Sequence, residues 1–225
     1  MSGWKDQGRS IFRPLAGVLA KRGLKPDHLT IAGLAFSILA ALLLSRGDFL
    51  GAALLLGLSG LCDMMDGDVA RATGSSTTFG AFLDSTLDRI GEGALFSGLA
   101  AYYFSRAQGG ALWIQGELEA GARWGDPEGR TMAFLALSTL ILSFMVSYTR
   151  ARAEGLGLEC KVGLMERPER ILLLGLGALL GQRFMPGVLG LLFLLTLVTV
   201  GQRVYHVRRL TRGDSSAKGG TTTHG

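Results

Sequence analysis

Residues 49–71 read FLGAALLLGLSGLCDMMDGDVAR, an apolar run whose last turns carry aspartates and an arginine. A helix needs about 20 mostly apolar residues to cross a bilayer, and residues 49–70 supply them. Charged side chains are costly within such a segment and usually serve a function. The stretch therefore predicts a membrane-spanning helix with a functional cluster at one end.

Similar apolar runs recur along the 225-residue chain, in which 48% of the residues are hydrophobic and 18% charged. That balance is typical of a membrane protein. We expect residues 1–212 to form one domain and the Gly-, Ser- and Thr-rich tail 213–225 to be disordered. The expected fold is an all-α integral membrane protein with six transmembrane helices at 29–45, 49–70, 81–104, 131–152, 170–184 and 186–205.

Basic residues lie mainly at the ends of the chain and in alternate connections. In residues 1–25, apolar side chains recur at helical spacing with Lys and Arg between them, which predicts an amphipathic helix in the headgroup layer. Because cytoplasmic connections are enriched in Lys and Arg, we expect both termini in the cytoplasm. The charges lie between apolar runs and form no single stripe, so they do not indicate nucleic-acid binding.

Four aspartates should converge where the second span ends and the third begins. Asp63 and Asp66 are three residues apart, and Asp84 and Asp88 are four apart, so each pair shares one helix face. Four carboxylates this close would repel one another without cations between them. Oxygen ligands with room left for phosphate oxygens suit Mg²⁺ or Mn²⁺.

The same two faces carry small residues. Gly67, Ala70 and Gly80 leave room for a substrate to lie against the backbone. Arg71 adds a cation suited to phosphate. A solvated helix end would explain a single acid, but not four acids on two faces lined by small residues.

Taken together, these residues resemble a family motif. All eight positions of the motif of the CDP-alcohol phosphotransferase family are matched by Asp63-x2-Asp66-Gly67-x2-Ala70-Arg71-x8-Gly80-x3-Asp84-x3-Asp88. The segment from Pro26 to Thr30 resembles the family's Pro-x3-Thr motif. The resemblance implies a membrane enzyme, usually a homodimer, that moves a phosphatidyl-type group from a CDP-linked lipid to an alcohol and releases CMP.

Carried over position by position, the resemblance implies a site for two ions, Mg²⁺ or Mn²⁺. It makes Asp63, Asp66 and Asp84 metal ligands, and it adds Asp88 to the metal site as the catalytic base on the acceptor hydroxyl. We expect this site at the cytoplasmic face of a prokaryotic plasma membrane. The residues expected to contact the CDP-linked lipid are Thr30, Gly67, Ala70, Arg71 and Gly80.

A second group of cations follows the fourth predicted span. Five cations in one short connection exceed what orientation alone requires, and they suit an acceptor that carries its own phosphate. Ordinary positive-inside charge is the alternative explanation for some of them. The candidate acceptor-binding residues are Arg150, Arg152, Lys161, Arg167 and Arg170.

The sequence around these cations favours one acceptor over the others. The stretch from Ser147 to Arg170 resembles the prokaryotic branch that makes phosphatidylinositol phosphate or archaetidylinositol phosphate from inositol 1-phosphate. Relatives that accept glycerol 3-phosphate also need a basic pocket, so this acceptor is the alternative. Serine and choline fit less well because they bring no phosphate.

Two other classes of protein share some of these features. Acids in a helical bundle also line the ion paths of transporters, but here they gather at one edge while the last two spans are almost wholly apolar. An inactive lipid-binding scaffold is disfavoured because no carboxylate of the motif is missing.

Overall fold

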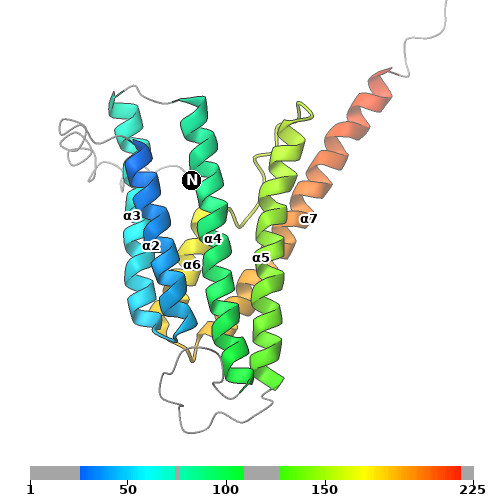
Figure 1. The fold of residues 1–225 in the computed structure, drawn as a ribbon. Helices are drawn as coiled ribbons and strands as arrows, with labels where there is room; N and C mark the ends of the chain where they lie inside the picture. The colour runs from blue at the N-terminus through cyan, green and yellow to red at the C-terminus, as the bar shows by residue number, and fades with distance from the viewer. Residues whose placement is uncertain (1–25, 74–76, 109–126, 219–225) are drawn as a thin grey trace, which may run out of the picture.

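The computed structural model describes residues 26–73, 77–108 and 127–218. This part of the chain is a bundle of long helices (Figure 1) and contains no strand. The helices are α2 (Pro26–Ser45), α3 (Phe49–Thr73), α4 (Thr78–Ala107), α5 (Pro127–Glu154), α6 (Arg167–Leu180) and α7 (Met185–Lys218).

Local sequence explains where several helices begin. The Thr77 hydroxyl caps α4 by accepting a hydrogen bond from the Gly80 amide at 2.9 Å. Pro127 is the first residue of α5, and Pro168 lies in the first turn of α6. The backbone N–H groups of a first turn have no acceptor within the helix, so proline, which has no N–H, is tolerated there. The turn from α2 to α3 uses Gly47 at φ 81°, a conformation that favours glycine.

The six helices pack in a closed ring. Neighbours in the ring are α2 and α3, α3 and α6, α6 and α7, α7 and α5, α5 and α4, and α4 and α2. In this order α4 and α6 face each other across the interior. The interior is one apolar core in which Leu44, Phe96, Leu99, Leu174 and Leu189 are fully buried.

Large apolar side chains also cover the outside of the ring. Leu54, Phe134, Ile141 and Leu172 are between 64% and 75% exposed. Apolar surface of this extent is unfavourable in water but ordinary in lipid. Four helices, α2, α3, α5 and α7, have the length and hydropathy to cross a membrane, so the protein is an integral membrane protein.

The six expected spans correspond to six helices, but α4 and α6 lack the length or hydropathy of an independent span. α6 has 14 residues, about 21 Å at 1.5 Å per residue, which is shorter than a hydrocarbon core of about 30 Å. α4 has 30 residues, but its first half carries Asp84, Asp88, Arg89 and Glu92.

Two expectations concern the ends of the chain. The amphipathic helix expected within 1–25 lies outside the described residues. At the other end, α7 continues to Lys218, past the point where the disordered tail was expected to begin.

Candidate active site

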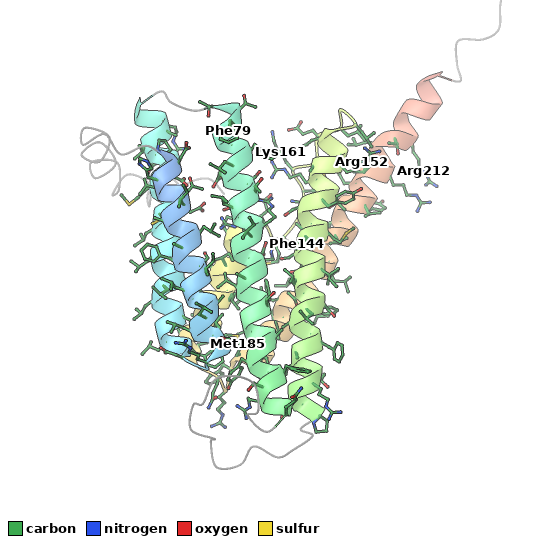
Figure 2. All side chains as sticks on the ribbon, viewed as in Figure 1. Phe79, Phe144, Arg152, Lys161, Met185 and Arg212 are labelled. Atoms are coloured by element: carbon green, nitrogen blue, oxygen red, sulfur yellow. The ribbon has the colours of Figure 1, made fainter. Side chains whose placement is uncertain are left out.

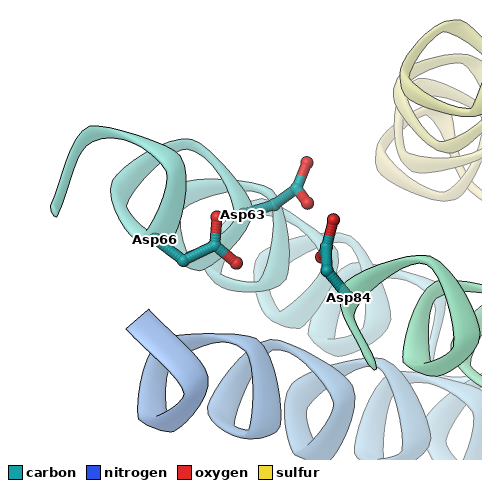
Figure 3. A group of neighbouring side chains, drawn as sticks. All are labelled: Asp63, Asp66 and Asp84. Atoms are coloured by element: carbon teal, nitrogen blue, oxygen red, sulfur yellow. The ribbon is translucent and has the colours of Figure 1, made fainter. Parts of the chain in front are cut away.

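Three aspartates from two helices meet at one end of the bundle (Figure 3). Asp63 and Asp66 come from the last turns of α3, and Asp84 comes from the second turn of α4. Each offers a carboxylate oxygen, and these oxygens all lie within 4.8 Å of one another. The structure therefore brings three of the four motif aspartates into one group.

This group fits a hard divalent cation. Oxygen ligands of this kind suit Mg²⁺ and Mn²⁺. Asp84 Oδ1 is buried and has no hydrogen-bond partner among the described residues. A buried carboxylate oxygen without a donor is costly, and a cation held by the group would satisfy it.

Thr30, which was expected to contact the CDP-linked lipid, lies directly beside the acids. Its Oγ1 is 3.0 Å from Asp66 Oδ2 and 3.2 Å from the carbonyl oxygen of Pro26. A hydroxyl has one hydrogen to donate, so the two acceptors share it. The contact with Asp66 joins the second turn of α2 to the acids of α3.

Asp88 lies one turn beyond Asp84 on α4 and faces α6. Arg167 Nη1 is 2.7 Å from Asp88 Oδ1 and 3.3 Å from Asp63 Oδ1. The group of three carboxylates within 4.8 Å does not include Asp88. Asp88 is thus the motif aspartate at the edge of the site. The Arg167 guanidinium contacts both Asp88 and Asp63.

A pocket opens beside these side chains. Its lining includes Thr30, the four motif aspartates and Arg167. The other lining residues are Gly33, Ser37, Ser59 and three leucines, Leu29, Leu34 and Leu87. The Ser37 and Ser59 hydroxyl oxygens are 2.9 Å apart, and Ser59 also donates to the Gly33 carbonyl oxygen at 2.9 Å. The pocket is thus lined by the charged groups of the site together with small residues and leucines.

The other expected lipid contacts surround the ends of α3 and α4. A Cβ at Gly67 would lie 3.4 Å from Arg71 Nη1, so the Arg71 guanidinium covers this glycine. Arg71 pairs with Asp68, and its side chain is 56% exposed. Gly80 lies in the capped first turn of α4, and Ala70 is partly buried on α3.

Three of the five expected acceptor-binding cations lie near the α5–α6 connection. Arg150 Nε is 2.9 Å from Glu154 Oε1. Lys161 is exposed and lies 2.6 Å from Glu159 Oε1; this hydrogen bond raises the pKa of Lys161 and lowers that of Glu159. Arg152 is exposed near the end of α5. Figure 2 labels Arg152 and Lys161 at the same end of the bundle as Phe79.

The remaining two cations belong to α6 and lie in different surroundings. Arg167 contacts the acids, as described above. Arg170 lies inside the ring with 1% of its side chain exposed, and its Nε and Nη2 bind the two carboxylate oxygens of Glu92 at 2.6 and 3.0 Å. The structure thus gives Arg170 an internal partner.

Two residues that sequence reasoning did not single out adjoin the cations. Glu166 Oε1 lies 3.9 Å from Arg150 Nη1 and 3.7 Å from Arg203 Nη2. Arg203 belongs to α7 and is only 2% exposed. Glu166 therefore holds cations from α5 and α7 beside the start of α6.

The chain matches known proteins over most of its length. Residues 24–200 match the family model described as CDP-alcohol phosphatidyltransferase. Phosphatidylinositol phosphate synthase of Mycobacteroides abscessus is 37% identical over 204 residues, which cover 88% of this chain and 84% of the relative. Archaetidylinositol phosphate synthase of Methanothermobacter thermautotrophicus is 35% identical over 207 residues, which cover 90% of this chain and 93% of the relative.

Solved structures agree with these matches. A crystal structure of Mycobacterium tuberculosis phosphatidylinositol phosphate synthase with CDP-DAG bound has a TM-score of 0.72 and 32% identity, and the match covers 88% of this chain and 94% of that one. The structure of the same enzyme in complex with manganese and citrate has a TM-score of 0.70 and 33% identity, and the match covers 86% of this chain and 87% of that one. The matched segment contains all eight motif positions and the three clustered carboxylates, and the chain belongs to the CDP-alcohol phosphatidyltransferase family.

Proposed function

We propose that the protein transfers a phosphatidyl-type group from CDP-diacylglycerol or CDP-archaeol to inositol 1-phosphate and releases CMP. The observation that carries the proposal is the cluster of Asp63, Asp66 and Asp84, with Asp88 and Arg167 paired at its edge. The cluster provides a metal site, and its edge provides a base next to a cation. Relatives named phosphatidylinositol phosphate synthase and archaetidylinositol phosphate synthase support the choice of acceptor.

The carboxylates of Asp63, Asp66 and Asp84 would hold two divalent cations, Mg²⁺ or Mn²⁺, with Asp88 at the border. When bound, the cations neutralise charge on the pyrophosphate of the CDP-linked lipid. Thr30 fixes the Asp66 carboxylate through its 3.0 Å hydrogen bond.

The CDP part of the donor lies against the ends of α3 and α4 in this proposal. Gly67, Ala70 and Gly80 leave space there for the nucleotide. The exposed guanidinium of Arg71 supplies a charge-assisted contact to phosphate.

The transfer itself needs a proton acceptor. Asp88 takes the proton of the acceptor hydroxyl while the hydroxyl oxygen bonds to the lipid-linked phosphorus. The bond from this phosphorus to the bridging oxygen breaks, and CMP leaves with the electron pair. Arg167 fixes the direction of the Asp88 carboxylate through the 2.7 Å contact.

The phosphate of the acceptor requires cations within reach of this base. Arg167 lies at the base, and Arg150 and Arg203 converge on Glu166, the residue before it. We propose these three guanidinium groups as the acceptor-phosphate site, while acceptor contacts of Arg152 and Lys161 stay predictions. The acceptor contact of Arg170, which is buried and paired with Glu92 in this structure, also stays a prediction.

The proposal includes six membrane crossings with both termini and the active site in the cytoplasm, in a homodimer in a prokaryotic plasma membrane. The crossings are supported by Figure 1, in which the start of α4 and the end of α5 lie at one end of the bundle. In Figure 2, Met185 lies toward the opposite end from Phe79 and Lys161. The distribution of basic residues supports the orientation, and the family resemblance supports the homodimer.

The test is CMP release by the purified protein with CDP-diacylglycerol and Mn²⁺. Inositol 1-phosphate, glycerol 3-phosphate, serine and free inositol are compared as acceptors. We expect the highest kcat/KM with inositol 1-phosphate. A higher value with glycerol 3-phosphate would establish the alternative acceptor, and faster release with serine or free inositol than with either phosphate would overturn the proposal. Light scattering of the purified protein tests the homodimer.

A further inference from the structure

Helix α7 is longer than a membrane crossing requires. It has 34 residues, from Met185 to Lys218, whereas about 20 residues cover a hydrocarbon core of about 30 Å at 1.5 Å per residue. Counted from Met185, this length ends at Tyr205. In Figure 1 the last turns of α7 lean away from α5 and extend beyond it. The segment after Tyr205 therefore leaves the hydrocarbon core and enters the headgroup layer.

One face of α7 is exposed both within the bundle and beyond it. Steps of three, four or seven residues keep side chains on a single helix face. The exposed residues at such steps are Leu191, Leu194, Val198, Tyr205, Arg208 and Arg212. Leu192, Thr199 and Arg203 lie on the opposite face and are at most 2% exposed. The apolar face that α7 turns outward therefore continues without a break into the segment after Tyr205.

The chemistry of this face changes along the helix from apolar to aromatic to cationic. The apolar residues come first, and Tyr205 follows with 69% of its surface exposed. Tyrosine is enriched where hydrocarbon meets water, because its ring is apolar and its hydroxyl is polar. Arg208, Arg209 and Arg212 come next. Arg209 belongs to the same face, because it follows Tyr205 by four residues and precedes Arg212 by three.

These three residues, termed the α7 arginines, are exposed and have no carboxylate partner among the side chains that the structure describes. Other cations at this end of the bundle are paired. The guanidinium groups of Arg167 and Arg203 lie 2.7 and 3.7 Å from a carboxylate oxygen. Water alone can solvate an arginine, so their place decides the argument. The α7 arginines follow a lipid-facing stripe at the depth of the lipid phosphates, where an anion is the complementary partner.

We propose that Arg208, Arg209 and Arg212 form a binding site for the headgroups of anionic phospholipids. The acyl chains of the bound lipid lie against the apolar part of the same face, and its phosphate contacts the guanidinium groups. A free phosphate ion would use the charges but not the adjoining apolar stripe. Figure 2 labels Arg212 at the same end of the bundle as Phe79 of α4, so the lipid belongs to the leaflet at the active-site end. The site is separate from the acids and does not depend on the proposed function.

Quenching of tryptophan fluorescence by brominated lipids measures which lipid touches this face. The reporter is Tyr205→Trp in the full chain, with Trp4→Phe, Trp113→Phe and Trp124→Phe as background. The protein is reconstituted in mixed bilayers of phosphatidylcholine and phosphatidylglycerol, with bromine on the chains of one lipid at a time. We expect phosphatidylglycerol to be preferred by about threefold or more at this reporter.

A second reporter, Leu191→Trp, is the control for position. It lies on the same face, about 21 Å away along the helix at 1.5 Å per residue, and so contacts the other leaflet. Because the α7 arginines cannot reach that leaflet, the preference for phosphatidylglycerol at this reporter should stay below about 1.5-fold.

Two charge variants separate the site from the net charge of the chain. The neutralised variant combines Arg208→Gln, Arg209→Gln and Arg212→Gln, and it should lower the preference at the Tyr205→Trp reporter to the control value. The relocated variant adds Thr221→Arg, Thr222→Arg and Thr223→Arg, which restore the net charge and the count of basic residues after the last span. We expect the relocated variant to lack the preference as well, because its charges are no longer on the exposed face of α7.

Each other outcome contradicts the proposal. Equal binding of the two lipids at the Tyr205→Trp reporter would mean that the α7 arginines are only solvated. A preference that survives neutralisation, or that relocation restores, would show that this face does not select the lipid. Absence of quenching by either lipid would show that protein covers the face.

Should the neutralised chain not fold, Arg208→Gln and Arg212→Gln are tested singly, and each should lower the preference measurably. Unchanged preferences in both single variants would overturn the proposal. The readout needs no turnover. A protein that prefers phosphatidylglycerol as stated but releases no CMP contradicts the proposed function and not this inference.

Discussion

Each carboxylate of the cluster formed by Asp63, Asp66 and Asp84 is a proposed metal ligand, and asparagine removes its charge with little change of shape. We expect each Asp→Asn change to abolish CMP release and to weaken Mn²⁺ binding. Asp48→Asn is the control, because Asp48 is an acid at the opposite end of the same helix, where it accepts a hydrogen bond from the Gly51 amide. A tenfold loss of rate corresponds to about 1.4 kcal/mol in the activation barrier. A cluster variant that keeps more than about a tenth of the wild-type rate would argue against a ligand role.

Asp88 differs from the cluster because it is not one of the three carboxylates that lie within 4.8 Å of one another, and its Oδ1 lies 2.7 Å from Arg167 Nη1. A base acts only when the acceptor hydroxyl is attacked. Asp88→Asn should therefore remove turnover while binding of Mn²⁺ and of the CDP-linked lipid stays within about twofold of the wild type. Both affinities can be measured by calorimetry on the detergent-solubilised protein. A loss of Mn²⁺ binding as large as that of Asp63→Asn would make Asp88 a primary metal ligand instead.

Gly67 tests the proposed place of the nucleotide. The three atoms nearest to a Cβ there belong to the Arg71 guanidinium, at 3.4 Å or more, and this flexible group can move aside. Gly67→Leu should therefore fold but bind the CDP-linked lipid at least about tenfold more weakly. Gly57→Leu, where nothing lies within 4 Å, is the control. Normal lipid binding by a folded Gly67→Leu protein would show that the nucleotide lies elsewhere.

Sequence spacing predicts the acid cluster because its members are close along two helices, whereas it does not reveal the partner of a buried charge. Glu92 stands out only as an acid within an apolar stretch, and that is a signal of a partner somewhere in the fold. The partner, Arg170, is 78 residues away. The sequence groups Arg170 with the nearby cations, because spacing within a connection does not indicate which side chain is buried.

At the scale of the elements, apolar runs predict the helices well, but not their exact length or pairing. Helix α6 ends at Leu180 because Gly181 adopts φ 86°, short of the expected boundary at 184. Close packing of α2 and α4 depends on Gly98, where a Cβ would lie 2.3 Å from the Ala41 carbonyl oxygen. Such a contact cannot be found from hydropathy, because glycine also occurs at positions with open space around it.

The Gly98 contact gives a prediction about helix packing. Gly98→Ala should destabilise the protein by about 1–3 kcal/mol, because the backbone of α2 must move away. Gly190→Ala in α7, with nothing within 4 Å, should be neutral or stabilising by up to about 1 kcal/mol through helix propensity. Thermal unfolding in detergent compares the two. Equal midpoints would mean that α2 and α4 do not approach as closely as the structure has them.

At the scale of the whole molecule, the order of helices in the ring is the feature that the sequence predicts least. In a soluble bundle, polar and apolar faces indicate which side of a helix turns inward. Here the outward side chains Leu54 and Leu172 are as apolar as the buried Leu44 and Leu174, so the pattern does not distinguish the lipid from the core. Polar contacts across the interior, such as Glu92 with Arg170, identify facing helices only after the fold is known.

The number of crossings can be tested at two exposed positions. If all six helices cross, Arg46, in the α2–α3 turn, and Lys161, in the α5–α6 connection, lie on opposite sides of the membrane. If only α2, α3, α5 and α7 cross, both residues lie on the same side. In a Cys62→Ser and Cys160→Ala background, we expect an impermeant maleimide to label Arg46→Cys from outside intact cells and Lys161→Cys only in inside-out vesicles. Labelling of both variants from one side would overturn the six crossings and with them the shared cytoplasmic placement of the acids and the acceptor-binding cations.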